Sequence, residues 1–111
     1  MSRRRRITQE QVEHESFFKM HKFLFSDEFI HMSNDSKVLY ALLRDRHELS
    51  NANGWVNDNG EVYLIYTRKE MSEMLGKSLP TVRKAVNELK ENGLMEEVQQ
   101  GLNRANLIYI M

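Results

Sequence analysis

The clearest periodic pattern of apolar and polar residues lies in 67–95, TRKEMSEMLGKSLPTVRKAVNELKENGLM, and it predicts two helices joined by a tight turn. Thr67 and Glu70 have the spacing of a capping box, in which each side chain satisfies a backbone N–H at the start of a helix. The first helix is therefore predicted to begin directly after Thr67. Apolar residues follow at helical spacing over 71–75, and Gly76 supplies the left-handed residue that ends the helix.

A second helix is predicted from Ser78, a good N-cap, to Asn92, with Gly93 closing it. Pro80 is tolerated there because N–H groups in the first helical turn have no partner within the helix. The face predicted to be buried consists of Leu79, Val82, Ala85, Val86 and Leu89. The predicted outer face carries Pro80, Thr81, Lys84, Asn87, Glu88 and Glu91, with Arg83 and Lys90 on its flank.

Two short helices around a glycine-containing turn are typical of a helix-turn-helix, whose second helix lies in the DNA major groove. In this interpretation Arg83 and Lys84 contact guanine edges or phosphates, and Asn87 suits adenine. Backbone contacts are expected from the helix starts and the turn, at Ser78, Pro80, Thr81, Thr67, Arg68 and Lys77. An ordinary pair of packed helices is the alternative for this window taken alone.

Three segments precede the helix pair. Residues 17–25, FFKMHKFLF, alternate loosely and predict a strand ended by Ser26 and Asp27. A long scaffold helix is predicted to start at 33–35 and to present an apolar face of Val38, Leu39, Leu42, Leu43 and Leu49 and a polar face of Lys37, Arg44, Asp45 and Glu48. Residues 55–66 then predict a β-hairpin around an Asn-Gly turn.

After Gly93, two further strands are predicted on either side of the turn 101–104. The resulting order of elements is that of a winged helix-turn-helix, an α+β fold with three main helices, a β-hairpin wing and here an extra N-terminal strand. The wing would bring Gln99, Gln100, Asn103 and Arg104 to phosphates or to an adjacent minor groove. A hairpin tip that is merely solvated is the alternative.

Residues 1–16 are polar and charged and predict a flexible arm that precedes a folded domain over 17–111. Four consecutive arginines, Arg3, Arg4, Arg5 and Arg6, open this arm. Such an arm can follow the DNA backbone or enter the minor groove. A solubilising or targeting tail is the other interpretation.

Overall charge is balanced, with 16 basic and 16 acidic residues, so any DNA-binding surface must be a local patch. The window from Arg68 to Lys90 is the locally positive one, with six basic residues against three acidic ones. The acidic balance outside the arginine run favours a rival interpretation, a winged helix that binds another protein. The aromatic segment 17–25 would then meet that partner; in the DNA-binding interpretation it is a candidate interface for a homodimer.

The sequence contains few motifs typical of catalytic, nucleotide-binding or metal-binding sites. The sequence Gly76-Lys77-Ser78 imitates the end of a phosphate-binding loop, but position 71, where the first glycine is required, is methionine. The four histidines lack metal-ligand spacing, and the chain has no cysteine and no apolar run of membrane-spanning length. We therefore expect no enzyme activity, no metal, no cofactor and no membrane contact, and a location in the cytoplasm.

Several segments together resemble the N-terminal domain of the RepA_N replication initiators of plasmids from Gram-positive bacteria, including staphylococcal multiresistance plasmids. The specific part of the resemblance is the succession KVLYALLRDR, NGWVNDNGEVYLIYT and QGLNRAN, supported by FFKMHKFLF and LGKSLPTVRKAVNELKENGLMEE. Together they cover nearly the whole chain after the arginine run. His21 is a departure, because many relatives have proline at that position.

The resemblance implies a dimeric double-stranded DNA-binding domain that recognises repeated sites at a plasmid origin. It also implies a separate C-terminal domain, outside this chain, that recruits host replication factors. Base reading would fall on Ser78, Thr81, Arg83, Lys84 and Asn87, and wing contacts on Asn103 and Arg104. A transcriptional repressor with the same fold is the nearest alternative, since its DNA chemistry would be the same.

Overall fold

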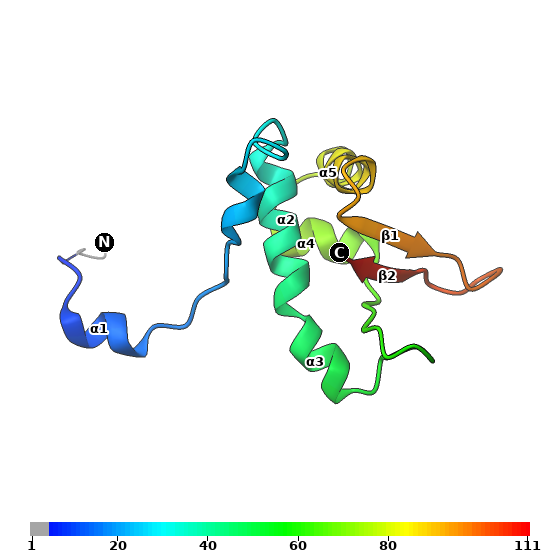
Figure 1. Ribbon diagram of the computed structural model, residues 1–111, viewed down its shortest axis with the longest axis horizontal. Coiled ribbons are helices and arrows are strands. Elements are labelled where there is room, and N and C mark those ends of the chain that lie inside the picture. Colours follow the sequence, from blue (N-terminus) through cyan, green and yellow to red (C-terminus); the bar gives the residue numbers. More distant parts are fainter. Residues whose placement is uncertain (1–4) are drawn as a thin grey trace.

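The computed structural model describes residues 5–111, and its helices pack beside one small sheet (Figure 1). The elements in chain order are α1 (Gln9–His14), the 3-10 helix η1 (Lys22–Phe25), α2 (Asn34–Asp45), α3 (His47–Ala52), α4 (Arg68–Leu75), α5 (Leu79–Glu91), β1 (Met95–Val98) and β2 (Leu107–Ile110). Helices α2, α4 and α5 pack on one another, and β1 follows α5 after a short turn. The predicted helix-turn-helix and wing are both present.

One hydrophobic core joins the three main helices to the sheet. Its fully buried side chains come from α2, α4, α5, β2 and the segments before them: Leu24, Leu39, Tyr40, Leu43, Leu64, Met71, Val82, Val86, Leu89 and Ile108. The buried positions of α5 recur at the spacing of one helical face, as predicted for four of five residues. Leu79 is the exception: it is 37% exposed because it is the first residue of α5, where the helix extends past the core.

The wing is an antiparallel pair with the register Met95↔Ile110 to Val98↔Leu107. Leu64 adds a third segment to this sheet, because its N–H and carbonyl bond the carbonyl and N–H of Ile108 at 2.8 and 2.9 Å. The strand predicted before α4 therefore joins the wing. The predicted hairpin over 55–66 forms its turn, but a single bridge, Val56↔Val62, joins its two sides. The next residues do not extend this pairing, because Leu64 pairs with Ile108 of β2 instead.

The predicted N-terminal strand is wrong. Residues 17–21 are extended without a strand partner, and Lys22–Phe25 form the 3-10 helix η1. Ser26 explains the turn: its backbone N–H and hydroxyl both bond the carbonyl of Phe23, at 3.0 and 2.6 Å. The turn places Leu24 fully inside the core, so the apolar residues serve a compact turn and not an alternating strand.

The predicted scaffold helix divides at Arg46 into α2 and α3, and its polar face is partly misassigned. Lys37 is only 3% exposed, because its Nζ donates to the carbonyl of Ile30 and lies 4.4 Å from the ring centroid of Phe25. Val38 and Leu49, predicted to be buried, are exposed. The segment between η1 and α2 covers the Lys37 side of the helix, which the periodicity of the helix alone does not reveal.

Residues 5–16 of the N-terminal arm stand away from the rest of the structure, as Figure 1 shows. Within it, α1 is a short helix that was not predicted; its capping box joins Thr8 and Gln11, and none of its residues is buried. Over residues 5–111, no helix has the length and apolar character needed to cross a bilayer.

Candidate nucleic-acid interface

The turn between α4 and α5 is built by local hydrogen bonds. Thr67 and Glu70 form the predicted capping box, with both side-chain-to-backbone bonds at 3.0 Å. Gly76 has φ 70°, the left-handed conformation that a residue with a Cβ adopts only with strain. The hydroxyl of Ser72 donates to the carbonyl of Lys77 and ties the turn back to α4. The angle between the two helices is therefore set by residues of the motif itself.

Ser78 occupies the predicted N-cap of α5, but its hydroxyl does not cap a backbone N–H. It lies 3.0 Å from the hydroxyl of Thr81 instead. Pro80 stands in the first turn of the helix, as predicted. The start of α5 thus presents two hydroxyls and first-turn N–H groups that the Ser78 side chain leaves open, an arrangement suited to phosphate oxygens.

The outer face of α5 forms a shallow open groove. It is lined by Pro80, Arg83, Lys84, Asn87, Glu88 and Glu91. Arg83, Lys84 and Asn87 are all exposed, and within residues 5–111 neither cation forms an ion pair. Because the opposite face of the helix is packed into the core, these side chains rest on a rigid base while their polar ends face solvent. Their chemistry is that of groups that read base edges in a groove.

Glu88 lines this outer face, as predicted, but its carboxylate binds the start of α2. Its Oε1 accepts hydrogen bonds from the N–H and hydroxyl of Ser33, at 2.7 and 2.9 Å, and from the hydroxyl of Ser36 at 2.6 Å. Burial acts to raise the pKa of Glu88, but the bonds from Ser36 and Ser33 outweigh it and hold the pKa below its ordinary value. Glu88 therefore anchors α5 to the start of α2.

Arg68 was predicted to contact DNA, and the structure gives it a different partner. Its guanidinium binds both carboxylate oxygens of Glu97 in β1, with one of the two bonds at 3.0 Å. Lys90 near the end of α5 lies 2.6 Å from the same carboxylate, whose side chain is only 6% exposed. Burial acts to raise the pKa of Glu97, yet the bonds and charges of Arg68 and Lys90 lower it to about 2. This triad joins α4, α5 and the wing.

The remaining predicted residues occupy three places. Lys77, in the turn, has its Nζ 3.9 Å from a carboxylate oxygen of Asp35. Asn103 and Arg104 are exposed at the tip of the wing, as expected for groups that reach DNA. Arg5 and Arg6 are exposed in the arm, whereas Arg3 and Arg4 lie outside the described residues.

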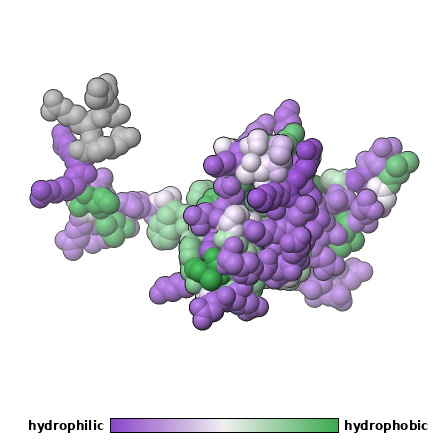
Figure 2. Space-filling model, turned by 90° about the horizontal axis from the view of Figure 1, so that it is seen from above, coloured by the Kyte–Doolittle hydropathy of each residue, from purple (hydrophilic) through white to green (hydrophobic). Residues whose placement is uncertain are grey.

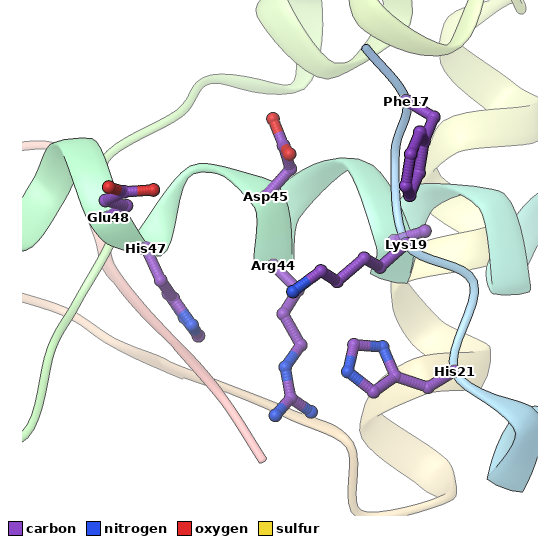
Figure 3. Close-up of a pocket in the computed structure, with 8 residues that line it drawn as sticks. Phe17, Lys19, His21, Arg44, Asp45, His47 and Glu48 are labelled. Carbon is purple, nitrogen blue, oxygen red and sulfur yellow. The ribbon is translucent and has the colours of Figure 1, made fainter. Parts of the chain in front are cut away.

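A hollow far from α5 lies between the segment before η1 and helices α2 and α3 (Figure 3). It is lined by Phe17, Lys19, His21, Ala41, Arg44, Asp45, His47 and Glu48. Burial, and then the charge of Arg44, lower the pKa of His47, so its imidazole is neutral at pH 7. Residues 5–111 contain no group of three side chains able to hold a metal ion.

The family described as Replication initiator protein A (RepA) N-terminus, RepA_N, matches residues 16–111. This chain belongs to the RepA_N family. A structure described as the N-terminal domain of a DNA-binding protein is 32% identical, with a TM-score of 0.83, over 98% of this chain and 84% of that one. A second, described as a Rep-DNA complex, is also 32% identical, with a TM-score of 0.81, over 96% and 83%.

A curated relative of this RepA_N chain is a 41 kDa protein of Lactobacillus helveticus, 31% identical over 103 residues. The match covers 92% of this chain but only 29% of that protein. The RepA_N chain thus corresponds to one part of a longer relative. The α+β winged-helix architecture expected from the sequence is confirmed by the solved structures it matches.

Sequence reasoning missed two residues of this RepA_N domain. Glu97 was not singled out, although it holds two of the basic residues counted in the positive window. Its signal was weak, because Glu97 adjoins the exposed Glu96 in the strand and its partners Arg68 and Lys90 lie 29 and 7 positions away in sequence. Leu102 lies in the predicted turn 101–104 at the tip of the wing and is 92% exposed, but no role was predicted for it.

Proposed function

We propose that this chain is the sequence-specific double-stranded DNA-binding domain of a plasmid replication initiator and that it recognises repeated sites at the origin. The observation that carries the proposal is α5: a helix with Arg83, Lys84 and Asn87 exposed on one face and the opposite face packed into the core. Membership of the RepA_N family and the likeness to a Rep-DNA complex support it. Specificity would come from base edges, and affinity largely from phosphates.

The test is selection of bound sequences from a pool of random duplexes at about 0.15 M salt, where non-specific binding is weak. We expect one motif, repeated in the parent plasmid's origin, and we expect Lys84→Ala and Asn87→Ala each to weaken binding by roughly 1–3 kcal/mol. Lys22→Ala is the matched control, because Lys22 is exposed on η1, away from α5. Equal binding by all four proteins would refute the assignment of α5 as the reading helix.

The place where the motif occurs separates initiation from transcription. A motif clustered at the origin supports the initiator, whereas a motif confined to promoters supports a repressor with the same fold. An initiator acts where its plasmid lies, which places the domain in the cytoplasm. The role that we propose for the domain is binding. We assign recruitment of host replication factors to a further part of a longer protein, since the 41 kDa relative extends well beyond the matched region.

The partner surface proposed for a second copy of the chain is the segment 17–25. Phe17, Phe18 and Met20 are 73%, 55% and 42% exposed there, and Phe17 also lines the hollow of Figure 3. Burying such side chains in a symmetric interface removes apolar surface from water. Sedimentation at tens of micromolar should give a dimer, and Phe18→Asp should give a monomer; a monomeric wild-type protein would refute this interface.

A further inference from the structure

The tip of the wing carries an apolar side chain that no other part of the described chain covers. Leu102 is 92% exposed, the largest exposed fraction among the large apolar side chains of residues 5–111. A single exposed leucine is common on protein surfaces, but its place here is unusual. Its neighbours Gln100, Asn103 and Arg104 are polar or basic and are themselves exposed. The leucine is thus surrounded by groups that bind phosphates and base edges.

The turn holds Leu102 in a defined position. The N–H of Arg104 bonds the carbonyl of Gly101 at 3.4 Å, which closes a four-residue turn with Leu102 in its second position. Asn103 follows with φ 63°, the left-handed conformation that such a turn accepts from asparagine. The side-chain amide of Gln100 also donates a hydrogen bond to the carbonyl of Ala105, at 2.9 Å, across the base of the turn.

The stem below the turn is the β1–β2 pair, which is fixed to the core through Ile108. The wing projects from the body of the domain in Figure 1, and Figure 2 shows apolar surface at its end. The 92% exposure of Leu102 means that its side chain faces solvent and does not fold back on the strands. Leu102 therefore lies at the end of the short, hydrogen-bonded wing that follows the helix-turn-helix.

We propose that Leu102 enters the DNA minor groove next to the site read by α5. There its side chain would pack on the deoxyribose sugars and separate two stacked base pairs. The proposal rests on the proposed function. Minor-groove proteins use leucine and similar side chains as wedges that unstack a step and bend the duplex. Arg104 and Asn103 would hold the backbone on either side. The free-energy cost of unstacking is lowest at flexible pyrimidine–purine steps, so Leu102 would favour sites that have such a step outside the major-groove contact.

The test compares Leu102→Ala with Leu102→Met and with Arg104→Ala on a duplex that carries the selected motif. Bend angle is measured by energy transfer between dyes at the two ends, and affinity by titration at several salt concentrations. We expect the wild-type protein and Leu102→Met to bend the duplex. Leu102→Ala should leave it nearly straight and bind roughly tenfold more weakly, with an unchanged salt slope, because only apolar contact is lost. Arg104→Ala should reduce the salt slope by about one.

Other outcomes overturn the proposal. Equal bending by the wild-type protein and Leu102→Ala would mean that the leucine makes no wedge, as would an unbent wild-type complex. A change in sedimentation of Leu102→Ala without DNA would assign the leucine to contact between copies. Failure of the wedge is distinguishable from failure of the DNA-binding function, because Lys84→Ala on the same duplex tests α5 alone.

Discussion

Replacing Glu97 with glutamine removes one negative charge from the junction of α4, α5 and β1 and keeps the shape of the side chain. In the wild-type domain that carboxylate binds Arg68 and Lys90 and is almost fully buried. Glutamine can still accept one hydrogen bond, but it provides no charge to the two cations. The substitution therefore measures the electrostatic part of the contact between the helix-turn-helix and the wing.

The size of the effect follows from the pKa. Lowering the pKa of Glu97 from its ordinary value of 4.5 to about 2 corresponds to at most about 3 kcal/mol of stability at pH 7. The side chains of Arg68 and Lys90 are 29% and 39% exposed, so solvent screens part of this attraction. We expect Glu97→Gln to lower the free energy of unfolding by roughly 1–2 kcal/mol at pH 7.

The pH dependence separates charge from packing. Because the folded pKa is depressed, the stabilisation is fully present above the ordinary pKa of 4.5 and is lost as pH falls toward about 2. Urea titrations followed by Trp55 fluorescence should show the deficit of Glu97→Gln at pH 7 and its decrease between pH 4.5 and 2. Glu96→Gln is the control, because Glu96 is exposed in the same strand and has no ion pair within residues 5–111. Equal stability of the two variants at pH 7, or a deficit that does not change with pH, would refute the reasoning.

Two further substitutions test the anchoring of α5. Glu88→Ala should destabilise the domain by about 1–3 kcal/mol in chemical denaturation, because it removes the acceptor of the Ser33 N–H and three hydrogen bonds that join α5 to the start of α2; a loss no greater than that of Glu91→Ala would contradict this. Gly76→Ala should cost roughly 1 kcal/mol in thermal unfolding, because φ 70° is strained for alanine even though its Cβ meets no atom within 4 Å; an unchanged melting temperature would show that the turn relaxes.

The parts of the fold that were predicted correctly depend on signals a few residues apart. The capping box at Thr67, the glycine at 76 and the buried positions of α5 are all local patterns, and each is confirmed. The wing was predicted for the same reason, since two short strands enclose a turn rich in turn-forming residues. Such features can be predicted from the sequence because the residues that interact lie within one helical turn or one hairpin.

Several of the errors arise from contacts with segments outside the element itself. Residues 17–25 contain enough apolar side chains for a strand, but Leu24 instead fills the core from a 3-10 turn. Lys37 lies on the polar side of its own helix, and a loop then covers it. The partner of Glu88 is 55 positions away and that of Arg68 is 29 away. A helical wheel shows which side chains share a face, but it does not show which other segment packs there.

These contacts explain how a chain with balanced charge can present basic side chains on the outer face of α5, the face that we propose reads DNA. Glu97 pairs with two cations of the positive window, and the carboxylate of Glu88 is held by two serine hydroxyls at the start of α2. Arg83 and Lys84, in the centre of the outer face of α5, have no acidic partner within residues 5–111. Glu88 thus helps to fix the orientation of α5, and Glu97 pairs with Arg68 and Lys90, which lie at the start of α4 and near the end of α5. Positive charge remains where α5 would meet base edges, so the placement of the acidic residues, and not their number, determines whether this domain can bind DNA.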